Sequence, residues 1–245
     1  MYEYYLLFLI ALVACMAFFS RTSARVKTTF RAYQDIASKS HMTGYDTATR
    51  LLRRNGVTDV SVQKVKGSLT DHFHPTQKAV NLSQATYGSD SVAAIAVAAH
   101  EVGHVMQKKE GYLPYKLRQV LVPITNMGSR LAIPLVFIGF LLDFSLMQSG
   151  GSQLGYTLAM IGVVGYGLST VFALVTLPVE FDASRRAKQM LLEEGIVTQS
   201  ELPYVEEMLG AAARTYVASL LVSTVLFLRF LMWVMMLFGG RRRRR

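Results

Sequence analysis

Cysteine is almost absent from this chain. Cys15 is the only one among 245 residues, and it lies in an apolar stretch near the N-terminus. A lone thiol cannot form a disulfide within the chain, and a zinc site built on several cysteines is excluded. Any metal that the chain binds for catalysis must therefore be held by histidine and carboxylate side chains.

Acidic residues are also scarce, with 16 Asp and Glu against 26 Lys and Arg, for a net charge of +10. Half of that excess is the terminal run Arg241 to Arg245, and the rest is scattered beside apolar segments without interleaved aromatics. This pattern argues against a nucleic-acid partner. It favours contact with a membrane surface and predicts that the arginine tail binds anionic lipid.

Apolar sequence is abundant, since 51% of the residues are hydrophobic and they gather in four blocks. The blocks are Tyr4 to Phe19, Leu131 to Leu142, Leu154 to Leu177 and Tyr216 to Phe238. The third is long and uncharged enough to cross a bilayer, which takes roughly 20 residues. The charges of the first block follow it, which indicates a retained anchor and not a cleaved signal peptide. The sequence therefore predicts a multi-pass protein of the cell membrane.

The distribution of Lys and Arg predicts which side faces the cytoplasm. Basic residues follow the first block and precede the second, whereas the loop Asp143 to Gln153 has neither Lys nor Arg. Cytoplasmic segments carry the excess of these residues. Residues 21 to 118 are therefore predicted to be cytoplasmic and the loop to be external.

The fourth block fits this scheme less well. If it crosses, Arg229 lies within an apolar run at a cost of a few kcal/mol, and the arginine tail ends outside against the charge rule. Two arrangements are open. The first is a re-entrant, interfacial or tilted helix with Arg229 facing protein or headgroups, and the second is a crossing helix in which Arg229 pairs with a buried carboxylate. The charge rule favours the first.

The strongest motif in the chain is the HExxH from His100 to His104. On a helix, it sets two imidazoles one turn apart on one face, with the carboxylate of Glu101 beside them. Two neutral imidazoles bind Zn²⁺, and the glutamate can take a proton from water that zinc has made acidic. Capping side chains at Ser89 to Ser91 and a stop at Gly111 predict a helix of about 20 residues around the motif.

Two short strands are predicted before this helix, at Val57 to Val65 and Lys78 to Leu82, with Gly67 to Gln77 as a polar loop between them. A strand beside a metal-binding helix can pair with an extended peptide through main-chain hydrogen bonds. A small sheet that only covers the helix is an equal alternative.

A catalytic zinc needs a third protein ligand. Glu180 is the first candidate, because it begins a helical stretch directly after the third apolar block, on the predicted side of the HExxH. A His₂Glu set of this kind is that of the gluzincin proteases. Asp182 is a candidate for orienting one imidazole. His72 and His74 are alternative ligands, and His72 is also a candidate for stabilising the oxyanion.

Several stretches resemble one known family. They are Gly67 to Pro75, Val80 to Ser83, Ala93 to Gln107 and Val179 to Ala187. They resemble the neutral zinc metallopeptidase family of bacterial membrane proteins, the YugP-like group, and the similarity spans nearly the whole chain. The resemblance implies that His100, His104 and Glu180 bind zinc and makes Glu101 the general base. The CAAX prenyl protease and heat-shock membrane protease families are more distantly similar.

The chain departs from these families at two places. Where the neutral zinc metallopeptidases commonly read Asp-His-Tyr-Asp-Pro, this chain has Asp71-His72-Phe73-His74-Pro75 and lacks the tyrosine hydroxyl. The related membrane proteases place an orienting aspartate four residues after the ligand glutamate, where this chain has Ser184. The missing tyrosine hydroxyl bears on how an oxyanion would be stabilised, and Ser184 bears on how an imidazole would be oriented.

These observations predict a mainly helical, multi-span membrane protein with a small α+β zincin-like domain of the gluzincin type that carries the HExxH on a helix. The expected order is an anchor, a catalytic domain, a membrane hairpin, a helical segment with the third ligand, and a C-terminal apolar helix with the arginine tail. Their expected bounds are residues 1–20, 21–118, 119–178, 179–215 and 216–245.

The predicted function is hydrolysis of peptide bonds by a membrane-anchored zinc endopeptidase. Its expected partners are a peptide or protein substrate, the bilayer, and a second copy of the chain or another membrane protein. The main alternative is a zinc-binding membrane scaffold or chaperone-like protein without catalysis, although a structural zinc usually has four ligands. A zinc transporter fits less well, because the apolar blocks hold no His or Asp pair.

Overall fold

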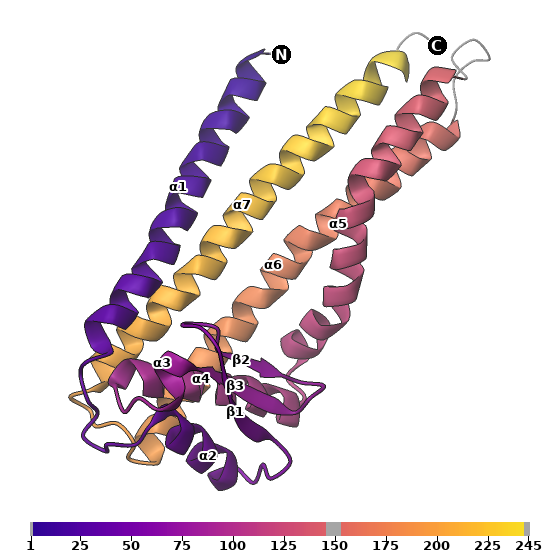
Figure 1. Cartoon of the computed structure of the whole chain (residues 1–245). Helices are drawn as coiled ribbons and strands as arrows, with labels where there is room; N and C mark the ends of the chain where they lie inside the picture. The colour runs from indigo at the N-terminus through magenta and orange to yellow at the C-terminus, as the bar shows by residue number, and fades with distance from the viewer. Residues whose placement is uncertain (1, 146–152, 243–245) are drawn as a thin grey trace. The chain divides into compact units, whose positions relative to one another are not determined.

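A computed structural model describes residues 2–145 and 153–242 of the chain. The fold is mainly helical, as predicted, and four long helices dominate it (Figure 1). They are α1 (Tyr2–Tyr33), α5 (Leu113–Ser145), α6 (Gln153–Glu193) and α7 (Leu202–Arg242). Each is long and apolar enough to cross a membrane. Most of the loop predicted to be external, and the last three arginines of the tail, lie outside the described residues.

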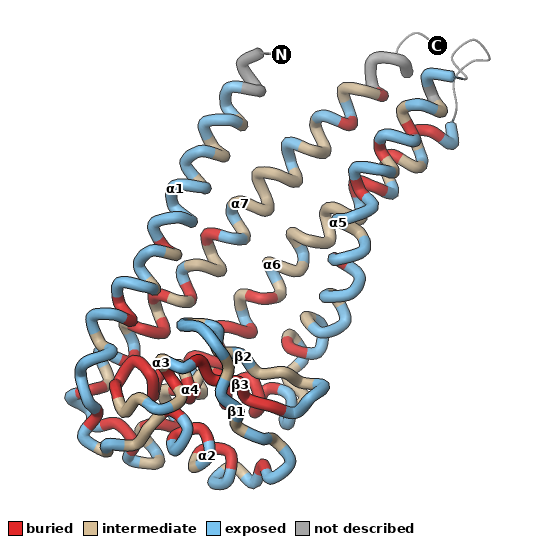
Figure 2. Tube along the Cα trace, in the orientation of Figure 1, coloured by how far each residue is buried: buried red, intermediate tan, exposed pale blue. Residues whose placement is uncertain are grey.

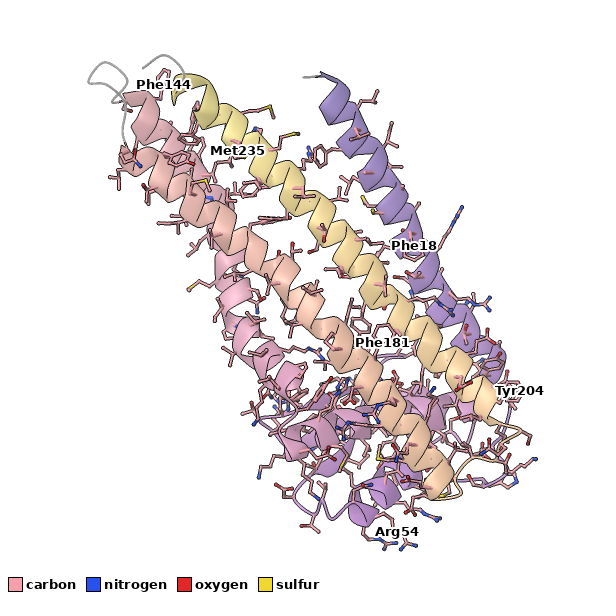
Figure 3. All side chains as sticks on the ribbon, turned by 180° about the vertical axis from the view of Figure 1, so that it is seen from behind. Phe18, Arg54, Phe144, Phe181, Tyr204 and Met235 are labelled. Atoms are coloured by element: carbon pink, nitrogen blue, oxygen red, sulfur yellow. The ribbon has the colours of Figure 1, made fainter. Side chains whose placement is uncertain are left out.

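The chain divides into two compact units. The helical unit comprises Met1–Phe19, Leu117–Thr176 and Val217–Arg245, and the α+β unit comprises Ser20–Lys116 and Leu177–Tyr216. Large apolar side chains are exposed along the helical unit, among them Phe18, Phe144 and Met235 (Figure 3). A surface of this kind suits lipid better than water.

Within the helical unit, α5 and α6 pack through glycine. A Cβ added at Gly128 would lie 2.6 Å from the carbonyl oxygen of Gly165, and one added at Gly162 would lie 2.7 Å from that of Ala132. Only small residues let helix backbones approach this closely, and such contacts favour helix association in lipid. The two helices therefore form a tight antiparallel pair.

α5 is longer than the second apolar block indicated. It begins at Leu113, well before Leu131, and continues through Pro123 and Pro134. Each proline removes one hydrogen bond of the helix. A helix that ended at either proline in lipid would leave a whole turn of backbone groups without hydrogen bonds. The helix continues because losing one bond at each proline costs less.

α7 runs beside α6 along the helical unit. Among the contacts that link them, Ser223 Oγ donates to Thr170 Oγ1 at 2.9 Å, the rings of Phe230 and Tyr166 lie 5.0 Å apart, and those of Phe238 and Tyr156 lie 5.9 Å apart. The described part of α7 is one continuous helix, so the re-entrant arrangement of the fourth block is not observed.

Arg229 is exposed on α7. Within residues 2–145 and 153–242 it forms no ion pair, so the pairing with a buried carboxylate that the sequence left open is not observed either.

The α+β unit holds a three-stranded sheet and the shorter helices. Its elements are α2 (Gly44–Arg54), β1 (Ser61–Val65), β2 (His72–His74), β3 (Ala79–Ser83), α3 (Gln84–Tyr87) and α4 (Val92–Glu110). The strand order is β1-β3-β2, with β1 parallel and β2 antiparallel to β3. β3 is buried throughout, which leaves β1 and β2 as the edges.

The strand β2 lies in the stretch predicted to be a loop. It pairs His72 with Asn81 and His74 with Ala79 of β3. Three residues with two histidines are too short and too polar to show the alternation typical of a strand, so pairing with β3 is what makes this segment extended. The first strand also begins later than predicted, at Ser61.

α4 is the central helix of the α+β unit and is buried along most of its length (Figure 2). Its predicted bounds are confirmed: Ser91 Oγ accepts a hydrogen bond from the N–H of Ala94, and Gly111 ends the helix at φ +69°. Leu51 of α2 and Leu82 of β3 are fully buried in the same core. The HExxH motif therefore lies inside a packed domain.

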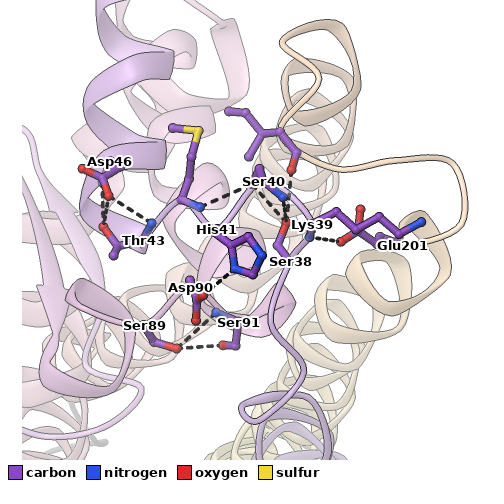
Figure 4. Close-up of polar contacts among 12 residues, drawn as sticks. Ser38, Lys39, Ser40, His41, Thr43, Asp46, Ser89, Asp90, Ser91 and Glu201 are labelled. Carbon is purple, nitrogen blue, oxygen red and sulfur yellow. Dashed lines mark hydrogen bonds and ion pairs between the residues drawn. The ribbon is translucent and has the colours of Figure 1, made fainter.

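The loop between α1 and α2 holds the start of α4 in place (Figure 4). The N–H of Ser38 donates to the carbonyl of Asp90 at 2.9 Å, and Nδ1 of His41 lies 3.3 Å from the Asp90 carboxylate. The N–H of Lys39 donates to Glu201, just before α7, at 2.7 Å. The beginning of the motif helix is thus bound to the α1–α2 loop, which in turn contacts the residue just before α7.

Candidate metal centre

Two imidazoles and one carboxylate converge in the α+β unit. His100 and His104 lie one turn apart on α4, and Glu180 reaches them from α6. Nε2 of His100 is 3.2 Å, and Nε2 of His104 is 3.6 Å, from the same oxygen, Oε2 of Glu180. The ligand atoms of the three residues all lie within 4.8 Å of one another. Groups at this separation can share one ion.

A glycine allows α4 and α6 to approach closely enough for this. A Cβ added at Gly103 would lie 2.6 Å from the backbone oxygen of Ala183. Ala183 follows Glu180 by about one helical turn. The middle of the HExxH motif is therefore in backbone contact with the helix that supplies the carboxylate, and a larger residue would push the two apart.

Burial constrains the charge of this cluster. Glu180 is only 2% exposed, and both imidazoles face its Oε2. A buried carboxylate is costly unless a positive charge or hydrogen-bond donors compensate it. A divalent cation between the three donor atoms would supply that compensation, and two histidines with one carboxylate are ligands that zinc accepts. The donor set therefore fits zinc.

Glu101 is buried beside His100 on α4 and is 8% exposed. Burial raises the pKa of its carboxyl to about 7, against the opposing influence of His100. Its Oε2 accepts a hydrogen bond from the backbone N–H of Phe73 at 2.8 Å. That N–H faces α4 and not β3, so the outer edge of β2 lies beside the motif helix.

Further contacts hold the other ring nitrogen of each imidazole. Nδ1 of His100 is 3.2 Å from Oγ of Ser184, and Nδ1 of His104 is 3.0 Å from Oε1 of Gln107. Asp182, expected to orient an imidazole, instead accepts a hydrogen bond from Nε2 of Gln107 at 2.9 Å. Its carboxylate reaches His104 only through that amide.

The structure does not bring His72 and His74 to this cluster. Nδ1 of His72 is 2.9 Å from the carbonyl oxygen of Thr70, and its Nε2 is 3.2 Å from Nδ2 of Asn81. Nδ1 of His74 accepts a hydrogen bond from the N–H of Gln77 at 3.2 Å. These nitrogens contact neighbours in the sheet and its loops. A role for His72 at the oxyanion stays a prediction.

Two neighbours of His104 are not predicted from the sequence. Gln107 lies three residues later, and this spacing on a helix could have indicated it, because such residues share a face. The ring of Tyr115 lies 6.3 Å from that of His104, and Tyr115 is buried. No motif marks Tyr115, because it comes from the start of the next helix, α5.

Comparison with known proteins gives the family of this chain. The family model described as "Putative neutral zinc metallopeptidase" matches residues 4–235. A protein of Bacillus subtilis (strain 168) named "Putative membrane protease YugP" is 40% identical over 236 residues, which cover 96% of this chain and 99% of the relative. No solved structure matches the chain. With two imidazoles and a carboxylate gathered at its HExxH motif, the chain belongs to the neutral zinc metallopeptidase family, whose metal is zinc.

Proposed function

We propose that this protein is a membrane-anchored zinc endopeptidase of the gluzincin type, with His100, His104 and Glu180 as the zinc ligands. The observation that carries the proposal is the convergence of three donor atoms from two helices within 4.8 Å. Membership of the family supports zinc as the ion and peptide hydrolysis as the reaction. Three protein ligands leave a fourth position for water or substrate, as catalytic zinc sites require.

Glu101 is the group that moves protons in this proposal. Zinc, when bound, supplies a Lewis acid that polarises the scissile carbonyl and acidifies water. The Glu101 carboxylate takes a proton from the attacking water and delivers it to the leaving amine. In the metal-free protein, burial raises the pKa of this carboxyl to about 7.

The outer edge of β2 is the surface along which we expect substrate to lie. β2 is an edge strand, and the N–H of Phe73 faces Glu101 on the motif helix. An extended peptide can pair with such an edge through main-chain hydrogen bonds, with little dependence on its sequence. The expected substrates are therefore unfolded or loop segments of proteins, including membrane proteins.

The α+β unit serves as the catalytic domain in this proposal and faces the cytoplasm. The excess of Lys and Arg in its segments next to the apolar helices supports that orientation. Contacts between α7 and α6 along the helical unit support a fourth crossing, in place of the interfacial helix that the charge rule favoured. The arginine tail would then lie outside, where anionic headgroups are its expected contact.

The test compares the purified wild type with Glu101→Gln and His104→Ala. Zinc content is measured, together with cleavage of an unstructured protein that carries a fluorescent label. Glu101→Gln should keep near-stoichiometric zinc while cleavage falls at least about a thousandfold, because the base is lost and the ligands stay. His104→Ala should lose the metal. Glu193→Gln, at an exposed glutamate of α6, is the matched control and should equal the wild type in both measurements.

Cleavage by Glu101→Gln at the wild-type rate would refute the mechanism. A wild type that binds zinc and cleaves nothing would favour the zinc-binding scaffold instead.

A further inference from the structure

Gln107 is a fully buried polar side chain on α4, one turn beyond His104. Its amide has three hydrogen-bond partners, which come from α4 and from α6. A buried amide with its partners satisfied is held in one position. The orientation of this amide therefore decides what the imidazole of His104 can do.

The partners of the amide nitrogen settle that orientation. Nε2 of Gln107 is 2.7 Å from the carbonyl oxygen of Val179 and 2.9 Å from Oδ2 of Asp182. A carbonyl and an ionised carboxylate can only accept, so the atom facing them must be the NH₂ group, and both of its hydrogens are used. Oε1, which cannot donate, is then the atom 3.0 Å from Nδ1 of His104.

Because Oε1 of Gln107 can only accept a hydrogen bond, the proton of this contact must lie on Nδ1 of His104. In a neutral imidazole one nitrogen donates and the other keeps its lone pair, so Nε2 is left as the free donor atom for an ion. Nε2 is also the nitrogen on the side of the cluster, 3.6 Å from Oε2 of Glu180. The amide thus selects the tautomer that a metal at the cluster needs.

His100 is not constrained in the same way. Its Nδ1 is 3.2 Å from the hydroxyl of Ser184, which can either donate or accept. Selection of a tautomer is therefore specific to the second histidine of the motif.

Asp182 is fixed by charged neighbours and so holds Gln107 in turn. Its Oδ2 accepts from Nε of Arg186 at 2.6 Å, and Arg185 pairs with its Oδ1. Arg186 also contacts Glu110 of α4 at 2.6 Å. These contacts keep the carboxylate turned toward the amide of Gln107.

We propose that Gln107 is a positioning residue of the metal centre, which holds His104 with its proton on Nδ1 and Nε2 free for zinc, and that Asp182 anchors Gln107. This inference rests on the zinc site proposed above. Groups that orient a ligand histidine are typically worth 10- to 100-fold in metal affinity. In this chain an amide stands between the carboxylate and the imidazole.

The first test replaces the amide without changing the length of the side chain. In Gln107→Met, zinc affinity of the full-length protein, measured by competition with a chromophoric chelator, should fall about 10- to 100-fold. The matched control is Gln189→Met at an exposed glutamine of α6, which should leave the affinity unchanged. Equal affinity of Gln107→Met and the wild type would overturn the proposal.

The link to Asp182 has its own test. Asp182→Ala should also weaken zinc binding, but should add no further loss in the Gln107→Met background, because both residues act through one amide. Fully additive losses would show that Asp182 acts separately and would overturn this part of the proposal.

A spectroscopic measurement on the wild type does not depend on whether the variants fold. In the zinc-loaded protein with ¹⁵N-labelled histidine, His104 should show a proton on Nδ1 and metal on Nε2. Carbonyl-labelled glycine identifies the backbone amide of His104, because Gly103-His104 is the only Gly-His pair in the chain, and ¹³C in the histidine links that amide to its ring nitrogens. Metal on Nδ1 would overturn the inference. A wild type that binds no zinc at all would refute the proposed function itself.

Discussion

Glu101 is a carboxyl group buried inside the α+β unit, and burial raises its pKa from an ordinary 4.5 to about 7. Between these two pH values the folded, metal-free protein binds more protons than the unfolded chain. Its stability therefore falls as pH rises from 4.5 to about 7 and stays lowered above that. A pKa rise of this size corresponds to roughly 3 kcal/mol.

Glu101→Gln should accordingly stabilise the metal-free protein by up to about 3 kcal/mol above pH 7, with the difference vanishing below pH 4.5. The amide oxygen can still accept the N–H of Phe73, so the main change is loss of a buried charge. Denaturant unfolding at several pH values, after removal of metal by a chelator, measures the effect. A difference that does not depend on pH would mean that packing and not charge is responsible.

Glu180 presents its carboxylate to both imidazoles. We therefore expect this residue to contribute to the affinity for zinc. Glu180→Gln keeps the shape but removes the negative charge, so zinc affinity should fall at least about a hundredfold, as for His104→Ala and unlike Glu101→Gln. Chelator competition measures this. Zinc bound as tightly as in the wild type would mean that Glu180 is not the third ligand.

At the scale of elements, the site depends on the backbone contact between α4 and α6 at Gly103. Gly103→Ala places a methyl group against the backbone of Ala183, where no flexible side chain can move aside. We expect a loss of stability of about 1–3 kcal/mol and weaker zinc binding, because Glu180 moves away from the imidazoles. Thermal unfolding and zinc titration measure the two effects.

The control for this prediction is another helical glycine of the α+β unit. A Cβ added at Gly210 of α7 meets nothing within 4 Å. Gly210→Ala should therefore leave zinc binding unchanged and stabilise the protein by about 0.5–1 kcal/mol. If both substitutions had the same effect, close approach of the helices would not be what holds the site together.

At the scale of the whole molecule, the open property is its orientation in the membrane. In a Cys15→Ser background, Thr76→Cys in the α+β unit should resist a membrane-impermeant thiol reagent in intact cells and react after lysis. Ser149→Cys, in the loop without Lys or Arg, should react in intact cells. The reverse pattern would place the site outside.

The same labelling assay tests the crossing of α7. A cysteine added after Arg245 should react in intact cells if α7 crosses the membrane beside α6, as we propose. Protection of this cysteine would mean that the arginines stay on the cytoplasmic side, in accord with the charge rule.

Local pattern was enough to predict the motif helix with its caps, the apolar blocks and the family. The HExxH, a capping serine and a stopping glycine act within one or two turns, so neighbouring residues carry the whole signal. The candidate ligand Glu180 could also be named, because few acidic residues lie beside an apolar block. The mechanism and the substrate edge stay proposals.

Contacts between distant residues could not be predicted in this way. β2 is a strand because β3 pairs with it, and α7 lies along α6 because side chains of both helices meet. Gln107 and Asp182 are 75 positions apart, so the hydrogen bond that places an amide between the carboxylate and His104 exists only once α4 and α6 have packed. Packing brings together groups whose separation in sequence leaves no periodicity to detect, and the contact between Nδ1 of His100 and Ser184, 84 positions later, is of this kind.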